Sequence, residues 1–284
     1  MWLFCFFIKL QSYIYFATFR DVVAIKKTKK MIFCRFYSRF CGFLYILIVV
    51  SDFIATFVEQ INNNNIMIKS IVIPRLAVLP QEAAAVPQVL DAMAVPFEPI
   101  ATVNWPNEFP YCPEVAVRMA WCPEGIVLHY RVDEQSVRAT YAEDNGKVWT
   151  DSCVECFIRN AESNTYYNIE CNCVGTLLIG LRGDDCGRCH LSLEAMVEVK
   201  RWASLGREAF GERAEQTPWE LALVIPASVF SGYPIKLEEG GTLRANFYKC
   251  GDDLPVPHFV SWNPINVEKP NFHRPECFGE LILG

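Results

Sequence analysis

Short segments in which apolar and polar residues alternate recur from about residue 105 onward, with turn residues between them. The segments 115–121 (VAVRMAW) and 126–132 (IVLHYRV) flank the turn Pro123-Glu124-Gly125, which predicts a β-hairpin. Since side chains alternate between the two faces of a strand, each such segment can cover one side of a shared core. The pattern predicts an all-β fold, an antiparallel β-sandwich or jelly roll. Further strands are expected at 137–141, 152–159, 166–173, 174–181, 196–202, 219–225, 243–250, 258–262 and 278–283, loops at 182–190 and 204–216, and one helical turn at 227–230.

Residues 1–66 differ in composition from the rest of the chain. They contain no proline and only 1 of the 15 glycines, but 11 of the 20 phenylalanines. They carry 8 Lys/Arg against 3 Asp/Glu, about +5, whereas the remainder carries 18 against 29, about −11, and the sum is the −6 of the whole chain. We therefore expect a non-domain segment at 1–66, an extended Pro-rich lead-in at 67–104 that lays one edge strand on the domain, and a single sandwich domain at 105–284.

Three interpretations of residues 1–66 stay open. Residues 42–58 (GFLYILIVVSDFIATFV) are strongly apolar, but they are shorter than the about 20 residues of a spanning helix, and Asp52 interrupts them. With Met31 as the start, Arg35 and Arg39 would precede this apolar run, as in a signal peptide or signal anchor. The interpretation we favour places the true start at Met67, after an Asn-rich tract. The protein would then be cytoplasmic, whereas a real segment 42–58 would make it membrane-anchored or exported.

Charge and cysteine content narrow the function classes. The acidic domain repels phosphate backbones, which argues against nucleic acid as a partner. Ten of the 13 cysteines lie after residue 66. Several of them, for example Cys156 and Cys250, stand where a strand would place Val or Ala, and unpaired thiols in such number favour a reducing compartment. We expect a monomer.

The segment around Trp149 carries the sharpest pattern of candidate binding residues. In a strand from residue 152 onward, Val154, Cys156 and Ile158 share the core face, so that Glu155 points away from the core. Trp149 stands in the turn just before this strand. An indole offers a flat apolar face for a pyranose ring, and an adjacent carboxylate can accept hydrogen bonds from sugar hydroxyls. A second tryptophan, Trp262, follows much later in Ser261-Trp262-Asn263-Pro264.

Several further motifs continue this pattern in a fixed order over residues 105–284: Tyr167-x-Ile-Glu170-x-Asn172-x2-Gly175, Pro218-Trp219-Glu220 running into Ile225-Pro226, Arg244-x-Asn246-Phe247-Tyr248, and Phe272-His273-x-Pro275-Glu276-x-Phe278-Gly279. The ordered set resembles family 9 carbohydrate-binding modules, most closely the stand-alone family 9-like proteins. The resemblance implies a β-sandwich that binds a mono- or oligosaccharide, often at a chain end, without catalysis. It implies stacking by Trp149 and Trp262, hydrogen bonds from Glu155, and an arginine from the following loop, either Arg182 or Arg188.

In one place the sequence departs from the family pattern, because Phe259 stands where an amide-bearing residue precedes the second tryptophan by three. Some family members carry structural calcium, for which Asp144, Asn145 and Asp151 are the candidate oxygen ligands. Acidic turn residues are more often only solvated, and we predict no metal.

Two alternatives come from other motifs. Cys186-Gly-Arg-Cys189-His190 matches the signature of covalent haem attachment and would make the chain an electron-transfer module; the cysteine pair is also half a zinc site. We favour a polar loop with two free thiols. The second C-x-x-C, Cys153 and Cys156, points to opposite faces of a strand. The other alternative is an activity associated with glycoside hydrolysis, for which a carboxylate pair could come from Glu155, Glu170, Asp151 and Glu220.

No catalytic serine, zinc-protease or phosphate-loop motif is present in the sequence. His129 lies within an alternating strand and is expected to be structural. His273 is expected to hydrogen-bond near one end of the sandwich.

Overall fold

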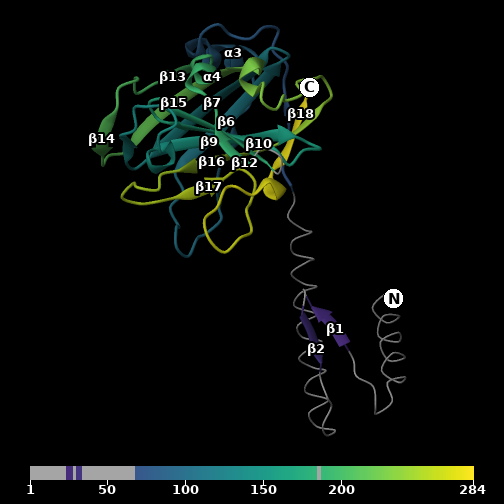
Figure 1. Ribbon diagram of the computed structural model, residues 1–284. Helices are drawn as coiled ribbons and strands as arrows, with labels where there is room; N and C mark the ends of the chain where they lie inside the picture. Colours follow the sequence, from purple (N-terminus) through teal and green to yellow (C-terminus); the bar gives the residue numbers. More distant parts are fainter. Residues whose placement is uncertain (1–23, 28–29, 34–67, 184–186) are drawn as a thin grey trace. The chain divides into compact units, whose positions relative to one another are not determined.

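The computed structural model describes residues 68–183 and 187–284, together with the backbone of two short strands, β1 (Ala24–Lys27) and β2 (Lys30–Phe33) (Figure 1). The chain forms two compact units, Met1–Asn65 and Ile66–Gly284. The strands β1 and β2 pair antiparallel in the first unit. The apolar run 42–58 and Met67 lie outside the described residues. Within the described ranges, no helix combines the length and the apolar character that a membrane span requires.

The second unit contains two extended sheets that face each other, as the sequence predicts for a sandwich (Figure 1). The larger sheet has the order β12-β11-β10-β9-β16-β17-β5, with β18 and β3 added beside β16. Its strands are β3 (Ser70–Ile73), β5 (Thr102–Val103), β9 (Cys153–Asn160), β10 (Tyr166–Asn172), β11 (Leu177–Gly183), β12 (Gly187–His190), β16 (Thr242–Cys250), β17 (Phe259–Ser261) and β18 (Gly279–Leu283). All of its pairings are antiparallel except that of β3 with β18.

The smaller sheet has the order β13-β15-β7-β6-β4. Its strands are β4 (Glu98–Pro99), β6 (Glu114–Cys122), β7 (Gly125–Glu134), β13 (Lys200–Ala203) and β15 (Thr217–Pro226). The hairpin β6–β7 confirms the prediction from the segments 115–121 and 126–132. A separate pair joins β8 (Val137–Ala139) to β14 (Phe210–Arg213), which lies in the stretch 204–216 that we expected to be a loop.

The main core lies between the two sheets. On β9 it takes Val154, Cys156 and Ile158, the three residues that alternation assigns to the core face. From β7 of the opposite sheet it takes Leu128 and Tyr130, among others. Burial of these apolar side chains is the main driving force for packing one sheet on the other. The alternation therefore fixes which face of β9 looks outward, and this face carries Glu155.

The lead-in is more regular than the expected extended segment. It forms a 3-10 turn, η1 (Ala83–Ala85), and a helix, α3 (Val86–Ala92), with Pro87 in the first helical turn, where a missing N–H costs no hydrogen bond. Val86 and Leu90 are buried against the outer face of the smaller sheet, in a second apolar cluster. Proline content led the prediction toward extended structure, but this proline begins a helix.

Two more predictions in the middle of the chain are wrong. The expected loop 182–190 is largely β-structure, because β11 continues to Gly183 and pairs antiparallel with β12. The expected strand 196–202 begins instead within a helix, α4 (Leu193–Val197), and only then becomes β13. The Ser192 hydroxyl accepts a hydrogen bond from the backbone N–H of Ala195 at 3.3 Å, a typical helix N-cap.

Candidate functional site

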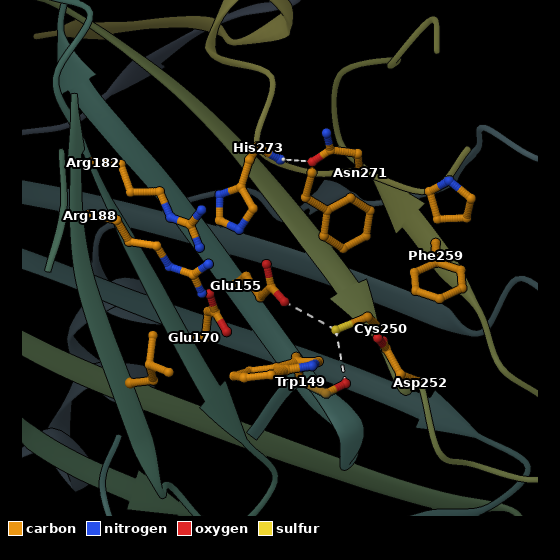
Figure 2. Close-up of a pocket in the computed structure, with 13 residues that line it drawn as sticks. Trp149, Glu155, Glu170, Arg182, Arg188, Cys250, Asp252, Phe259, Asn271 and His273 are labelled. Atoms are coloured by element: carbon orange, nitrogen blue, oxygen red, sulfur yellow. Dashed lines mark hydrogen bonds between the residues drawn. The ribbon is translucent and has the colours of Figure 1, made fainter. Parts of the chain in front are cut away.

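A cavity of about 210 Å³ opens on the outer face of the larger sheet (Figure 2). Its floor is formed by neighbouring strands of that sheet, and its rim by the 3-10 turn η2 (Val148–Thr150), by β17 and by the loop that precedes β18. We call this space the sheet cavity. Its lining residues are Trp149, Glu155, Glu170, Leu178, Arg182, Arg188, Cys250, Asp252, Phe259, Pro270, Asn271, Phe272 and His273.

The register of β9 and β10 places two carboxyl groups side by side in the floor. Glu155 and Glu170 are direct cross-strand partners, so both side chains leave the sheet on the same face. The outward direction of Glu155 is the one that strand alternation predicts. Glu170 was singled out in the sequence only as one member of a carboxylate pair for hydrolysis. Figure 2 shows both carboxyl groups between the two arginines and Trp149.

Both glutamates are almost completely buried, at 3% exposed for Glu155 and 5% for Glu170. Burial raises the pKa of Glu155 well above its usual range, and the neighbouring Glu170 adds to the shift. Burial likewise raises the pKa of Glu170 to about 7, against hydrogen bonding from Asn168 and the attraction of the arginines. The Asn168 amide donates to Oε1 of Glu170 at 2.8 Å, and the Cys250 thiol donates to Oε1 of Glu155 at 3.1 Å.

Both candidate arginines reach the sheet cavity. Arg182 on β11 and Arg188 on β12 are cross-strand partners, and Figure 2 shows their side chains next to each other and beside the glutamates. Arg182 is half-buried, and burial lowers its pKa. Arg188 is exposed. The sequence left open which of the two arginines serves the site. The pairing of β11 with β12 brings both of them to the sheet cavity.

Trp149 lines the sheet cavity from the turn η2 and is half-buried. It packs on the apolar cluster of the outer face, which includes Val148 and Cys153. Its backbone oxygen accepts a hydrogen bond from the Cys250 thiol at 3.5 Å. The aromatic ring therefore stands at the edge of the floor, next to the glutamates, as the sequence predicts for this residue.

Trp262 is not at the cavity, and the predicted clamp of two tryptophans is wrong in this respect. Its side chain is 0% exposed and packs in the core between the sheets, with its ring centroid 5.6 Å from that of Phe247. Gly279 makes room for it, because a Cβ atom there would lie 2.3 Å from Cζ3 of the indole. Trp262 continues the alternation of β17, in which Val260 points into the core and Phe259 points outward. Phe259 lines the sheet cavity instead.

Phe259, Asp252 and His273 are lining residues that the sequence did not propose for binding. Burial raises the pKa of Asp252 to about 6. The signal that could have found Phe259 is the strand rule applied to Glu155, since residues 259 and 261 must lie on the face opposite to residues 260 and 262. The position of Asp252 depends on the loop after β16, for which the sequence offers no such rule.

His273 is held by Tyr166 and Phe157. Its Nδ1 atom lies 3.0 Å from the Tyr166 hydroxyl, and its ring stacks on Phe157 at a centroid distance of 4.9 Å. Burial, together with the charges of Arg182 and Arg188, lowers the pKa of His273 to about 3, so the ring is neutral at physiological pH. The sequence predicted a hydrogen-bonding role for His273, and the structure adds that it forms part of the cavity wall.

The acidic turn residues named as candidate calcium ligands bind groups of the protein itself. Asp144 accepts hydrogen bonds from the backbone of Leu177 at 2.9 Å and from Arg201 at 2.7 Å. Asp151 is buried and accepts from the Thr140 hydroxyl at 2.8 Å and from the amide of Asn172 at 3.1 Å. The side-chain amide of Asn145 donates to the carbonyl of Leu191.

The remaining sequence candidates fall elsewhere. Cys186 of the C-x-x-C-H motif lies outside the described residues, while Cys189 and His190 are exposed on β12. Cys153 and Cys156 point to opposite faces of β9, as predicted, because Cys153 joins the outer cluster and Cys156 the core. His129 is buried between Arg118 and Glu220, which agrees with a structural role.

A comparison with family models identifies the family. The model of carbohydrate-binding family 9 matches residues 84–283. The chain belongs to carbohydrate-binding family 9. Residues 1–66 lie outside this match.

Solved structures are similar to this family 9 chain as well. A candidate carbohydrate-binding protein from Bacteroides uniformis ATCC 8492 is 45% identical, with a TM-score of 0.72 over 76% of this chain and 99% of that one. Two structures of a family 9 module from Caldicellulosiruptor kristjanssonii, in complex with glucose and with cellotriose, are 11% identical with a TM-score of 0.46. Each alignment covers 76% of this chain, and it covers 96% of the chain in the glucose complex and 93% of the chain in the cellotriose complex. No curated protein matches the chain.

Proposed function

We propose that the sheet cavity binds one ring of a saccharide, stacked on Trp149 and contacted by Phe259, and that Glu155, Glu170, Arg182 and Arg188 hydrogen-bond its hydroxyls. The observation that carries the proposal is the convergence of one half-buried indole, two paired carboxyls and two paired arginines in a single cavity of a family 9 chain. Aromatic faces beside a few polar groups are the usual composition of a site for a small polar ring.

The size of the cavity supports a small ligand. Its volume of about 210 Å³ lies below the about 300–1,000 Å³ that is usual for drug-sized ligands, so that one ring fits better than several. Further rings of an oligosaccharide would extend into solvent. The ligand class is therefore a monosaccharide or the terminal ring of a longer chain.

The polar groups support recognition of neutral hydroxyls. A hydroxyl is both donor and acceptor, so it can donate to a carboxylate and accept from a guanidinium at the same time. The carboxyl pair and the arginine pair lie on adjacent strands of one sheet, and each attracts the other electrostatically. Such bonds inside a buried site are worth more than the same bonds in water.

The aromatic residues would supply the apolar part of the affinity. Stacking on a ring contributes about 0.5–1.5 kcal/mol beyond the burial of area, if sugar faces behave like other flat partners. With a single well-formed stacking face, we expect a dissociation constant in the micromolar range or weaker.

Isothermal titration of the purified domain against a panel of mono- and disaccharides tests the proposal. Trp149→Ala should weaken binding of the best ligand by at least about tenfold, which corresponds to about 1.4 kcal/mol. The matched control is Trp202→Ala, because Trp202 is also half-buried but lies on β13 of the other sheet. Binding that is equally strong in wild type and Trp149→Ala, or that is lost equally in both variants, would contradict the proposed site.

A further inference from the structure

Two cysteines and one glutamate meet at the sheet cavity, where Glu155 and Cys250 line its floor and Cys153 lies beside them outside the lining. In the register of β9 and β16, Cys153 and Cys250 are direct cross-strand partners. Glu155 follows Cys153 by two residues on β9 and therefore points to the same side of the sheet. The two thiols and the carboxyl thus leave three neighbouring backbone positions in the same direction.

The ligand atoms of these residues lie close together. The Sγ atoms of Cys153 and Cys250 and a carboxyl oxygen of Glu155 all lie within 4.8 Å of one another. All three residues are buried, at 0%, 1% and 3% exposed for Cys153, Cys250 and Glu155. Zinc sits about 2.3 Å from thiolate sulfur and about 2.0–2.2 Å from carboxylate oxygen, so the three side chains must draw closer together for one ion to reach all three atoms.

We propose that Cys153, Glu155 and Cys250 form a zinc site whose open coordination position faces the sheet cavity. Two soft thiolates and one carboxylate select zinc rather than calcium or magnesium, which prefer oxygen ligands alone. A set of three protein ligands with a fourth position for water or substrate is the usual arrangement of an accessible zinc site.

The charges around the three residues favour a bound cation. Glu155 shares this space with Glu170 and Asp252, and the repulsion among these acids adds to the cost of their burial. Arg182 attracts Glu155, and Arg182 and Arg188 both attract Glu170. Buried charges in proteins are generally paired or bound to metals, and a divalent ion among these acids would add to the positive charge of the arginines.

The thiols have weak partners that a metal could replace. The Sγ atom of Cys250 lies 3.1 Å from Glu155 and 3.5 Å from the Trp149 carbonyl and can donate its single proton to one of them at a time, and Cys153 donates to the Val154 carbonyl at 3.6 Å. Zinc binding would release both thiol protons to solvent, together with the carboxyl proton of the fraction of molecules in which Glu155 is neutral. No bond is oxidised or reduced in this step.

The direction of the open position links the site to the proposed ligand. Cys250 and Glu155 line the sheet cavity directly, so the fourth position of the ion opens into it. Water would fill this position in the absence of a ligand, and an oxygen of a bound saccharide could take its place. Zinc and saccharide would then share Glu155, and zinc occupancy should change the affinity for the sugar.

The experiment uses the full chain, purified under reducing conditions and freed of metal with a chelator. Cobalt(II) is titrated in the absence of sugar, because cobalt bound to thiolate has charge-transfer absorption that is absent for oxygen ligands alone. Zinc affinity is then measured by displacement of cobalt. We expect one cobalt per chain with thiolate absorption, and loss of this absorption in Cys153→Ser and in Cys250→Ser.

Two further variants make the test decisive. Cys156→Ala is the matched control, because Cys156 lies on the same strand but faces the core between the sheets, and it should leave the absorption unchanged. Glu155→Gln keeps both thiols and should weaken zinc binding by at least about tenfold, which decides the matter if a serine variant fails to fold. Absence of thiolate absorption in wild type, or its persistence in both serine variants, would overturn the proposal.

Sugar titration of the metal-free protein separates this inference from the proposed function. Cys153 does not line the sheet cavity, so Cys153→Ser should lose zinc and still bind sugar with the affinity of the metal-free wild type. A protein that binds sugar but fails to bind zinc refutes only the metal site, and a protein that binds zinc but fails to bind any sugar refutes only the saccharide site.

Discussion

The two faces of strand β16 carry buried ionisable groups with different partners: opposite charges pair on one face, and like groups adjoin on the other. Lys249 points between the sheets, where its Nζ atom lies 2.8 Å from Oε2 of Glu134 and 2.8 Å from Nε2 of His258. Lys249 and Glu134 are both 0% exposed, and the Trp219 indole donates to the other oxygen of Glu134 at 2.8 Å. The next residue, Cys250, points to the sheet cavity, where like groups adjoin: two thiols and the carboxyls of Glu155 and Glu170.

The difference separates a structural cluster, in the interior, from the proposed binding site, in the sheet cavity. In the interior, opposite charges neutralise each other within the protein. In the sheet cavity, burial and mutual repulsion raise the pKa values of the carboxyls, and the nearby arginines compensate only in part. An arrangement of like groups costs stability, and such costs are characteristic of functional sites, where an external partner completes the set.

The largest effect is expected from breaking the buried ion pair of Lys249 and Glu134 between the sheets. Lys249→Met should lower the free energy of unfolding by about 3–5 kcal/mol, because it leaves the carboxylate of Glu134 buried without its cation. Denaturant unfolding measures the loss. The double variant Lys249→Met/Glu134→Gln should recover part of it, and a double variant no more stable than the single one would show that the pair is not the cause.

A smaller effect is expected at Gly180, the cross-strand partner of Asn168. A Cβ atom at this position would lie 2.4 Å from Oδ1 of Asn168, whose amide donates to Glu170. Gly180→Ala should therefore cost about 1–3 kcal/mol of stability and disturb the hydrogen bond to Glu170. Gly211→Ala is the control, since no atom lies within 4 Å of a Cβ added there. Equal stability of the two variants in thermal unfolding would contradict this packing.

Protonation of Glu170 should make stability depend on pH. Burial raises its pKa from 4.5 to about 7, so its neutral form stabilises the fold below about pH 4.5, and this contribution disappears as the pH rises to about 7. Glu170→Gln removes the titration. The variant should gain stability relative to wild type over this range, by at most about 1.4 kcal/mol per pH unit. A constant difference between the two proteins across pH 4.5–7 would refute the raised pKa.

The smallest effect concerns the rim. Under the proposed function, Phe259→Ala should weaken sugar binding by about 0.5–1.5 kcal/mol, less than Trp149→Ala, because it removes one aromatic contact and no hydrogen bond. Phe259→Trp should keep or improve the affinity. Isothermal titration of both variants measures this, and an affinity in Phe259→Ala equal to that of wild type would remove Phe259 from the site.

The alternation of residues predicted the sandwich, most of its strands and the outward direction of Glu155. These features depend on the burial of every second side chain, and this pattern is visible within a short segment of the sequence. The same rule applied to residues 258–262 would have sent Trp262 to the core and Phe259 to the cavity. Trp262 was wrongly predicted to stack on the sugar because the family resemblance implies that role. The alternation of residues 258–262, which points Trp262 into the core, was not considered.

Other features, such as the pairing between strands, could not be predicted from the sequence of a single segment. The partnership of Glu155 with Glu170, and of Cys153 with Cys250, depends on the register between strands, which the sequence of either strand alone does not state. The helix α3 was missed because prolines before and after it suggested extended structure. The strand β12 was missed because its residues are polar and exposed and give no alternating pattern.

The sheet cavity draws its charged groups and its contact rings from different kinds of segment. Glu155, Glu170 and Arg182 lie on strands held on both sides by hydrogen-bonded neighbours, whereas Trp149, Phe259 and residues 270–273 come from a short turn, a three-residue strand and a loop. A protein engineer could randomise positions 259, 270 and 271 to accept differently shaped ligands while the scaffold beneath them stays intact. Selectivity could thus be reprogrammed at the periphery without rebuilding the base.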